Sequence, residues 1–361
     1  SGRLEATTDT AQAVHRSQVV VVIVPVLLTP DKRADLSAIE AAARDVSRGL
    51  AKGTLVVFET TLPVGTTRNR LGPILEKGSG LRMGIDFHLA FSPERVSSRR
   101  VLRDLATYPK VVGGIDAAST EAAARFYRQV LAADVMAVRD SETAEFAKLA
   151  ELVYRDVNIA LASELAGCAS RANIDIMEAI AAANSQPYSH IHQPGVGVGG
   201  HCVPVNPWFL IDGLGPAPLA RLAREVNDGM AKQAARLLEE ALGGLAGRTV
   251  LILGLAYRAN VKEAYHSAAL LLNEALTEAG ATVLVHDPLF SRQEVESQGV
   301  KAASLEPPPP VDAIVLQAYH DEYKSLDLRA FQGCRVLLDG RNVLSREEVE
   351  GNGMRYLGIG R

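Results

Sequence analysis

Residues 18–24 read Gln-Val-Val-Val-Val-Ile-Val, and residues 54–58 read Thr-Leu-Val-Val-Phe. Short apolar runs of this kind are typical of strands that are buried on both faces of a parallel sheet. Between them, the alanine-rich residues 35–50 predict a helix. Further elements follow in alternation: helices at 66–77 and 119–131, and strands at 88–91, 110–112 and 134–136. This alternation predicts an α/β domain with helices on both faces of a parallel sheet.

The same pattern returns after Gly247. Residues 249–253 read Thr-Val-Leu-Ile-Leu and predict a strand, and residues 267–279 predict a helix that Gly280 closes. Further strands are predicted at 281–285, 313–316 and 335–338. The sequence therefore predicts a second α/β domain.

The middle of the chain is helical. In residues 141–182, apolar side chains recur every three or four positions and predict one buried stripe: Phe146, Leu149, Val153, Val157, Leu161 and Leu165. Residues 217–242 predict a long amphipathic helix. We therefore expect an α/β fold of two Rossmann-like doubly wound domains joined by a helical connector, with boundaries at 1–139, 140–242 and 243–361.

The beginning of the first domain is unusual. Residues 2–7 predict a short strand and residues 9–16 a helix, and the buried strand at 18–24 follows at once. No Gly-X-Gly-X-X-Gly fingerprint opens the domain, although such a fingerprint normally binds a dinucleotide pyrophosphate. We expect the first domain to be incomplete, without its first strand and glycine loop.

Composition excludes several classes of protein. The 361 residues carry a formal net charge of −4, which gives no general attraction for nucleic acid or an anionic membrane. No apolar stretch approaches the roughly 20 residues of a membrane span, and no signal peptide is recognisable. The three cysteines are far apart and form neither a disulfide framework nor a metal-ligand spacing. We expect a cytoplasmic protein without a metal.

A glycine-rich segment precedes Cys202. Residues 194–204 read Pro-Gly-Val-Gly-Val-Gly-Gly-His-Cys-Val-Pro. Glycines allow left-handed turns and a close approach of the backbone to a ligand, so this loop can present a thiol beside inward-pointing N–H groups. That arrangement suits a covalent nucleophile whose substrate carries phosphates. From the loop alone, a buried cysteine behind a glycine turn remains an equal alternative.

Polar residues follow two of the predicted strands and mark one predicted helix. Residues 59–67 read Glu-Thr-Thr-Leu-Pro-Val-Gly-Thr-Thr, and residues 91–95 read Phe-Ser-Pro-Glu-Arg. Ligands of open α/β sheets bind at the ends of such strands. Each feature also has a structural interpretation: a helix cap for the first segment, a surface ion pair for Glu94 with Arg95, and a snorkelling surface group for Lys148.

Together these segments resemble the UDP-glucose/GDP-mannose dehydrogenase family of nucleotide-sugar 6-dehydrogenases. The similar motifs occur in the family's order at 59–67, 92–96, 148–151, 154–160, 199–205, 223–227, 254–258 and 339–342. The Arg-Asp-Val-Asn and Gly-Gly-His-Cys forms look most like the branch that acts on UDP-N-acetylhexosamines. Each motif is weak alone, but the ordered set is specific and spans essentially the whole chain.

The resemblance implies that the chain oxidises the C6 alcohol of a UDP-sugar to a carboxylate and consumes two NAD. UDP-N-acetylmannosamine or UDP-N-acetylglucosamine is the favoured substrate, and polysaccharide biosynthesis the expected role. Cys202 matches the family nucleophile, which forms a thiohemiacetal and then a thioester. Lys148 matches the group that stabilises the oxyanion, and Thr61 and Glu94 match the groups that hold the hydrolytic water, with Glu94 as the general base.

The resemblance also assigns binding residues. Pro25 and Val26, with Thr61 and Glu94, match positions that contact NAD. Positions that match the substrate side are Asn158, Gly199, Gly200, His201 and Arg258. The family uses its central helices as a two-fold interface, so a homodimer is expected, with no nucleic-acid or membrane partner.

Several positions depart from the family pattern. We expect roughly seventy residues, with the opening strand, glycine loop and helix, to be missing relative to the family, which predicts weaker binding of NAD than of UDP. Val26 replaces a frequent threonine, and Leu152 a common asparagine. Asn206 stands where many members carry an aspartate that pairs with the lysine, and 265–267 read Tyr-His-Ser in place of Arg-Glu-Ser.

Three alternatives remain open at this point. The chain could be a truncated, inactive UDP-sugar-binding remnant, or a UDP-glucose 6-dehydrogenase. A cysteine hydrolase that uses Cys202 and His201 is disfavoured, because adjacent residues of an extended segment point to opposite sides.

Overall fold

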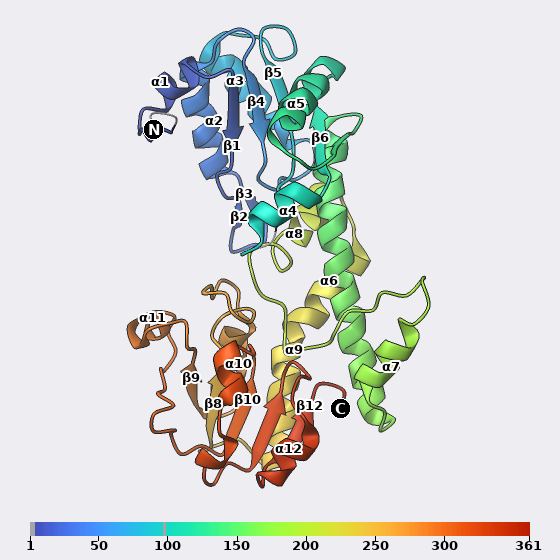
Figure 1. Ribbon diagram of the computed structural model, residues 1–361, viewed down its shortest axis with the longest axis vertical. Coiled ribbons are helices and arrows are strands. Elements are labelled where there is room, and N and C mark those ends of the chain that lie inside the picture. Colours follow the sequence, from blue (N-terminus) through green and yellow to red (C-terminus); the bar gives the residue numbers. More distant parts are fainter. Residues whose placement is uncertain (1–3, 97–98) are drawn as a thin grey trace. The chain divides into compact units, whose positions relative to one another are not determined.

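A computed structural model describes residues 4–96 and 99–361 of the chain. The residues form two compact units (Figure 1). The first unit runs up to Val153 and also takes in Val205–Ala217. The second comprises Tyr154–Pro204 and Pro218–Arg361.

The first unit is built on a five-stranded sheet in the order β1-β4-β5-β6-β7. The strands are β1 (Val19–Val22), β4 (Leu55–Phe58), β5 (His88–Phe91), β6 (Lys110–Gly114) and β7 (Val135–Ala137). β1, β4 and β5 are parallel, as predicted, and β7 is parallel to β6. β6, however, runs antiparallel to β5, so the expectation of a wholly parallel sheet is wrong. Antiparallel neighbours can be joined at one edge without a crossover, and the connection from β5 to β6 is of that kind.

Several helices belong to this unit. They are α1 (Thr10–His15), α2 (Ser37–Gly49), η1 (Thr67–Leu71), α3 (Gly72–Ser79), α4 (Val101–Thr107), α5 (Ala117–Val130) and α8 (Pro207–Gly213). α1, α2 and α3 pack together, and α5 packs against β4 to β7 (Figure 1). A small hairpin is formed by β2 (Leu27–Leu28) and β3 (Ala34–Asp35). Residues 4–7 form no strand, contrary to the prediction, while residues 2 and 3 lie outside the described part.

The second unit has a wholly parallel sheet in the order β12-β11-β10-β8-β9. Its strands are β8 (Thr249–Leu253), β9 (Thr282–His286), β10 (Ala313–Leu316), β11 (Val336–Asp339) and β12 (Arg355–Gly358). The strand order reverses between β8 and β10, and open α/β sheets bind ligands outside the carboxyl ends of the strands at such a switch point. The predicted doubly wound domain is therefore confirmed, with β12 as a strand that the sequence did not reveal.

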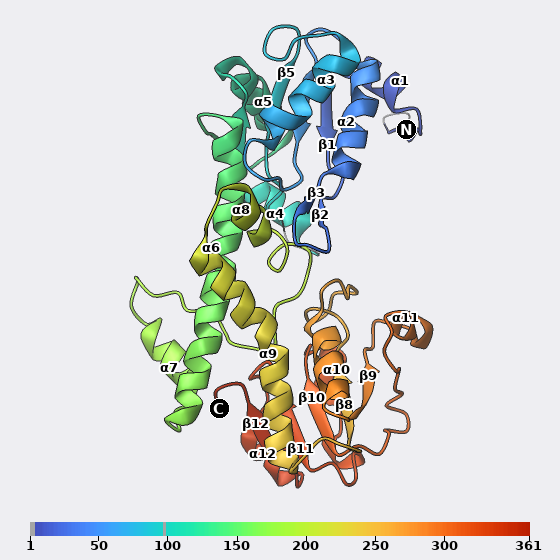
Figure 2. The ribbon, with the colours of Figure 1, turned by 180° about the vertical axis from the view of Figure 1, so that it is seen from behind.

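The second unit's helices are α7 (Ile176–Ala183), α9 (Pro218–Leu242), α10 (Ala268–Glu278), α11 (Arg292–Glu296) and α12 (Arg346–Gly351), with short turns at η2 (Asp321–Ser325) and η3 (Leu328–Ala330). α9 packs against α10 and β11, which is best seen from behind (Figure 2). Their apolar faces join one core with the strands, in which Leu238, Leu272 and Val315 are fully buried.

The long helix α6 (Ser141–Arg171) begins in the first unit and ends in the second. The predicted buried stripe on this helix is correct only in part. Leu149 is buried and Val153, Val157 and Leu165 are half-buried, but Phe146 and Leu161 are 46% and 47% exposed. The buried face instead carries polar residues at helical spacing: Glu145, Lys148, Asp156 and Ser163, beside Leu149, Leu152 and Ala160. The apolar periodicity of the sequence did not identify this whole face, because the polar side chains buried on it weaken its apolar pattern.

In the second unit, α6 and α9 are joined by a buried ion pair. The Arg224 guanidinium on α9 is 1% exposed and donates to Asp156 Oδ1 of α6 at 2.6 Å, and to Asp228. Asn227 donates to the Asp156 carboxylate at 2.8 Å and to its backbone carbonyl at 2.9 Å. Burial raises the pKa of Asp156, and the Arg224 charge opposes that rise.

Arg224→Met is expected to lower the free energy of unfolding by about 3–5 kcal/mol, because Asp156 would remain as an uncompensated buried charge. The measurement is urea unfolding followed by circular dichroism. Arg248→Met is the control, since the Arg248–Asp312 pair is partly exposed and its loss is expected to cost less than about 1 kcal/mol. Equal losses in the two variants would contradict a dominant role for the buried pair.

Candidate active site

Two loops at the carboxyl edge of the first sheet carry Thr61 and Glu94. Thr61 follows β4 and is half-buried, and Glu94 follows β5. The backbone N–H of Glu94 donates to the Glu59 carbonyl at 3.1 Å, which ties the two loops together. The Glu94 carboxylate accepts the N–H of Val96. Arg95 does not pair with Glu94; it donates to Glu151 at 2.8 Å, so the predicted alternative of a Glu94–Arg95 surface pair is wrong.

The buried Glu145 of α6 anchors the loop that contains Thr61. Its carboxylate accepts the N–H groups of Gly65 at 2.5 Å and Thr67 at 2.9 Å, and the Thr67 hydroxyl at 2.7 Å. Glu145 therefore caps the start of the η1–α3 segment from another helix. Lys148 lies one turn further along α6, so Glu145 ties the Thr61 loop to the helix that carries Lys148.

Lys148 and Asn206 are both buried. The Lys148 side chain is 6% exposed, so it is not the snorkelling surface lysine of the alternative interpretation. Asn206 is 4% exposed and stands immediately before α8. Leu152, on the same face of α6 as Lys148, is 4% exposed and packs as an ordinary apolar residue.

The predicted NAD-contacting residues share one edge of the first sheet. Val22 of β1 pairs with Phe58 of β4, so residues 23–26 and the loop with Thr61 leave the sheet at the same carboxyl edge. Pro25 is exposed and Val26 buried. Parallel strand ends of this kind are where doubly wound domains bind dinucleotides, so the edge fits NAD.

In the second unit, the glycine loop packs tightly on residues 257–267. A Cβ at Gly199 would lie 2.7 Å from both the His266 carbonyl oxygen and Tyr257 Cβ, so only glycine fits there. Gly200 has φ +97° and donates its N–H to the Tyr265 carbonyl at 3.0 Å. The left-handed turn was predicted from the glycine density, whereas the close contact at Gly199 is with the protein's own residues; an approach to a ligand stays a prediction.

Cys202 is exposed at the end of this loop, so the alternative of a buried cysteine is wrong. The neighbouring His201 ring stacks on Tyr265 with 4.1 Å between centroids, and its Nε2 contacts the Glu263 carboxylate. His201 is thus held by Glu263 and Tyr265. Of the other cysteines, Cys168 is exposed, whereas burial raises the pKa of Cys334 to about 11.

Asn158 anchors the segment that leads to the glycine loop. Its amide donates to the His190 carbonyl at 2.8 Å and accepts the His192 N–H at 2.8 Å. Both ends of the amide are engaged in the protein, and a direct substrate contact by Asn158 stays a prediction.

Arg258 follows β8 at the switch point of the second sheet. A second arginine, Arg341, lies at the same carboxyl edge: its guanidinium donates to the carbonyls of Gln317 and, at 3.4 Å, Tyr257. Burial lowers the pKa of Arg341 to about 10. A Cβ on Gly195 would lie 3.4 Å from the Arg341 guanidinium, so the glycine loop approaches this arginine. The site assignment missed Arg341, although the Asp-Gly-Arg-Asn motif that contains it was recognised.

Asp287 supports the same edge and was also missed. Its carboxylate accepts the N–H groups of Leu255 and Ala256 at 2.8 Å each, and His320 Nε2 lies 2.9 Å away. These bonds fix the backbone from which Arg258 projects.

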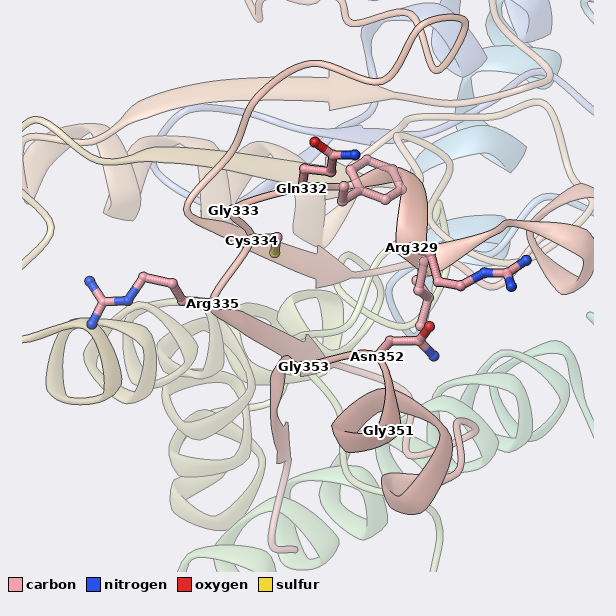
Figure 3. Close-up of a pocket in the computed structure, with 10 residues that line it drawn as sticks. Arg329, Gln332, Gly333, Cys334, Arg335, Gly351, Asn352 and Gly353 are labelled. Atoms are coloured by element: carbon pink, nitrogen blue, oxygen red, sulfur yellow. The ribbon is translucent and has the colours of Figure 1, made fainter.

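A cavity of about 630 Å³ lies elsewhere in the second unit (Figure 3). It is lined by residues 328, 329, 331–335 and 351–353, which precede β11 and β12 at the amino edge of the sheet. Figure 3 shows Arg329 and Arg335 extending away from each other around it. None of the predicted site residues lines this cavity, and it lies at the edge opposite to the one where such sheets bind nucleotides.

Comparisons with known proteins agree with this architecture. Models of the UDP-glucose/GDP-mannose dehydrogenase family match the chain in order: the NAD binding domain at residues 1–131, the central domain at 142–229 and the UDP binding domain at 251–346. A UDP-N-acetyl-D-mannosamine dehydrogenase of Pyrococcus horikoshii is 34% identical over 100% of this chain and 85% of its own length. An NDP-N-acetyl-D-galactosaminuronic acid dehydrogenase of Ralstonia solanacearum is 35% identical over 96% of this chain and 83% of its own.

A solved structure of a Methanosarcina mazei protein, described as NDP-N-acetyl-D-galactosaminuronic acid dehydrogenase, superposes with a TM-score of 0.88 at 32% identity. It covers 100% of this chain and 81% of that chain. The family matches define a nucleotide-sugar dehydrogenase, an oxidoreductase that uses NAD, and the two α/β sheets agree with that class. The chain belongs to the UDP-glucose/GDP-mannose dehydrogenase family, and its match to the UDP binding domain indicates a UDP-sugar substrate. Within the described residues, no helix combines the length and apolarity that crossing a bilayer requires.

Glu145 predicts a specific pH dependence of stability. Burial raises its pKa to about 7, while the hydrogen bonds from Thr67 and Gly65 act in the opposite direction. Between pH 4.5 and 7 the folded protein holds a proton that the unfolded chain has released, so stability falls as pH rises through this window, by about 3 kcal/mol in total. Glu145→Gln, which cannot ionise, is expected to abolish that slope in urea unfolding measured from pH 4.5 to 8.

The control for this experiment is Glu142→Gln. The Glu142 carboxylate lies on the same helix and pairs with Arg68 at 2.5 Å, and its pKa is lowered, so it does not titrate toward pH 7. The slope should survive in this variant. A slope that also persists in Glu145→Gln would exclude Glu145 as its source.

Proposed function

We propose that the protein oxidises the C6 alcohol of a UDP-N-acetylhexosamine, with UDP-N-acetylmannosamine favoured, to the uronic acid through a covalent intermediate on Cys202. The observation that carries this proposal is an exposed thiol at the end of the glycine loop, in the unit whose sheet edge carries Arg258 and Arg341. The names of the similar proteins support the N-acetylhexosamine, since they are UDP-N-acetyl-D-mannosamine and NDP-N-acetyl-D-galactosaminuronic acid dehydrogenases.

The proposed reaction proceeds in four steps. The alcohol loses one electron pair and two protons and becomes an aldehyde. The Cys202 thiol adds to the aldehyde and forms a C–S bond, which gives a thiohemiacetal. Loss of a second electron pair and two protons gives a thioester, and water then breaks the C–S bond to release the carboxylic acid and the thiol. Pro25, Val26, Thr61 and Glu94 would hold NAD, which would supply the oxidising power for each of the two oxidations; in sum the reaction uses two NAD and one water.

The first unit supplies the groups for the polar steps. Lys148 stabilises the oxyanion by its positive charge, because a charge removed from bulk water acts strongly on a developing anion. Thr61 holds the hydrolytic water, and Glu94 removes a proton from it. Asn206 contributes a neutral amide to this water network.

The second unit binds the nucleotide. Arg258 and Arg341 bring two cations to the switch-point edge, which suits a pyrophosphate. The N–H groups of the loop with Gly199, Gly200 and His201 are available to the phosphate or the sugar. A role in polysaccharide biosynthesis follows from the product, because uronic acids are polysaccharide units. A cytoplasmic location is consistent with three cysteines that form no disulfide within the described residues.

Substrate preference tests the proposal directly. UDP-N-acetylmannosamine is expected to give a kcat/KM at least tenfold above that of UDP-glucose, and two NADH should form for each uronic acid. UDP-N-acetylglucosamine is assayed in parallel. A preference for UDP-glucose would favour the alternative assignment as a UDP-glucose 6-dehydrogenase, and one NADH per product would contradict the two-step chemistry.

Cys202→Ser is expected to lower carboxylate formation by at least a thousandfold, because a serine hydroxyl is a weaker nucleophile and a poorer leaving group than a thiol. UDP binding, measured by calorimetry, should change less than twofold. Cys168→Ser is the matched control, since Cys168 is the other exposed cysteine and should be dispensable. Normal turnover by the Cys202 variant would refute the covalent mechanism.

We extend the proposal to a homodimer. In the second unit, apolar side chains on the helices are exposed: Tyr154 and Leu161 on α6, and Leu219 and Leu222 on α9. Large apolar side chains exposed on helices are candidates for an interaction surface, and most symmetric oligomers are two-fold dimers.

Light scattering should therefore give about twice 38.5 kDa for the purified protein. The double variant Leu161→Glu/Leu222→Glu is expected to shift the mass toward that of the monomer, because it places one charge on the exposed apolar side of α6 and one on that of α9. A monomer at micromolar concentration without any substitution would contradict the dimer.

A further inference from the structure

The direction of β6 brings Lys110 to the edge that carries Thr61 and Glu94. β6 is antiparallel to β5, with Phe91 opposite Gly113, so its first residue lies beside the carboxyl end of β5. In a parallel sheet, Lys110 would lie at the far edge instead. Lys110 is 7% exposed, and a buried lysine requires a partner.

That partner is Glu59, the residue that follows β4. Lys110 Nζ lies 2.9 Å from Glu59 Oε1 and 3.5 Å from the Ser92 carbonyl oxygen, and 4.8 Å from the centroid of the Tyr127 ring. The hydroxyl of the buried Tyr127, on α5, donates to the same Glu59 oxygen. Burial and the Glu59 charge raise the pKa of Tyr127, so this hydroxyl stays protonated as a donor.

The backbone of the same residues connects the two site loops. Glu59 accepts the N–H of Glu94 at 3.1 Å, and its own N–H donates to the Val22 carbonyl at 3.0 Å, on the strand that leads to Pro25. Ser92 donates its N–H to the Phe58 carbonyl at 2.9 Å and its hydroxyl to the Val111 carbonyl at 2.7 Å. We call Lys110, Glu59 and Tyr127 the Lys110–Glu59–Tyr127 network. It lies where backbone hydrogen bonds join the carboxyl ends of β1, β4 and β5.

We propose that the Lys110–Glu59–Tyr127 network positions Thr61 and Glu94 for hydrolysis of the covalent intermediate. The three residues are positioning residues: they act on the loops and do not touch the substrate. Thr61 lies two residues after Glu59, and Glu94 is hydrogen-bonded to the Glu59 backbone, so a shift of Glu59 moves both groups. Displacements of about 1 Å can lower a rate by roughly a hundredfold. This inference rests on the proposed function, because it assigns Thr61 and Glu94 to the hydrolytic step.

The experiment measures hydrolysis separately from substrate binding. Variants Glu59→Gln, Lys110→Met and Tyr127→Phe are mixed with UDP-sugar and NAD, quenched over time, and analysed by mass spectrometry for the adduct on Cys202. In the two charge-removing variants, the hydrolysis rate constant should fall at least tenfold and the adduct should accumulate, while UDP affinity changes less than twofold. Tyr127→Phe, which removes one hydroxyl, should slow hydrolysis about threefold, and Lys110→Arg should restore most of the wild-type rate.

Two controls make the outcomes distinguishable. Asp312→Asn breaks the ion pair with Arg248 at the amino edge of the second sheet, far along the chain from the two site loops. This variant therefore loses an ion pair, as the network variants do, but leaves the site loops unchanged. It should lower the unfolding temperature, and no adduct on Cys202 should accumulate. Glu94→Gln tests the hydrolytic role itself. If Glu94→Gln accumulates adduct and the network variants hydrolyse it at the wild-type rate, the positioning role is refuted and the proposed function stands.

If Glu94→Gln also shows no adduct, the hydrolytic assignment fails together with the inference. Should Glu59→Gln or Lys110→Met not fold, Tyr127→Phe decides alone: an unchanged hydrolysis rate in that variant overturns the proposal.

Discussion

Buried carboxylates hold the loops at the edges of both sheets. A carboxylate removed from water requires several donors, and backbone N–H groups at strand and helix ends are the donors nearest to hand. Glu145 binds residues 65 and 67, Asp287 binds residues 255 and 256, and Asp339 accepts the N–H groups of Arg341, Val343 and Leu344. Each of these carboxyl groups thereby fixes one loop that carries a candidate site residue, so the geometry of the site depends on these side chains staying buried and hydrogen-bonded.

This constraint explains the composition of α6. Its buried face carries Glu145, Lys148 and Asp156 among apolar residues, whereas Phe146 and Leu161 lie exposed. A helix selected only for stability would bury the apolar residues, because replacing a buried ion pair with apolar side chains is often neutral or stabilising. The polar face of α6 is therefore explained by what it holds: the Thr61 loop through Glu145, α9 through Asp156, and the segment before the glycine loop through Asn158.

The sequence predicted what depends on local pattern. The apolar runs at 55–58 and 249–253 identified strands because both faces of those strands are buried, and the glycines before Cys202 identified a tightly packed turn. The apolar pattern of a strand does not reveal its direction in the sheet, so β6 was expected to be parallel to β5. In that orientation Lys110 would lie far from Thr61 and Glu94, and it was therefore not predicted as part of the site. Glu145 could have been predicted from the sequence, because it lies three residues before Lys148 and therefore on the same face of the helix. Arg341 and Asp287 needed the sheet order, because only the fold brings the ends of β9 and β11 to the edge that carries Arg258.

The pairing of buried charges also bears on Asn206. In the related motif this position is often an aspartate that pairs with the catalytic lysine, and an ionised partner would neutralise part of the lysine charge. Asn206 is buried and cannot ionise, so in the proposed reaction it adds no negative charge to the water network. An amide also cannot accept the proton of the attacking water. Proton removal then falls to Glu94 alone, and the position of Glu94 depends on the backbone of Glu59, which the buried Lys110 charge and the Tyr127 hydroxyl hold in place.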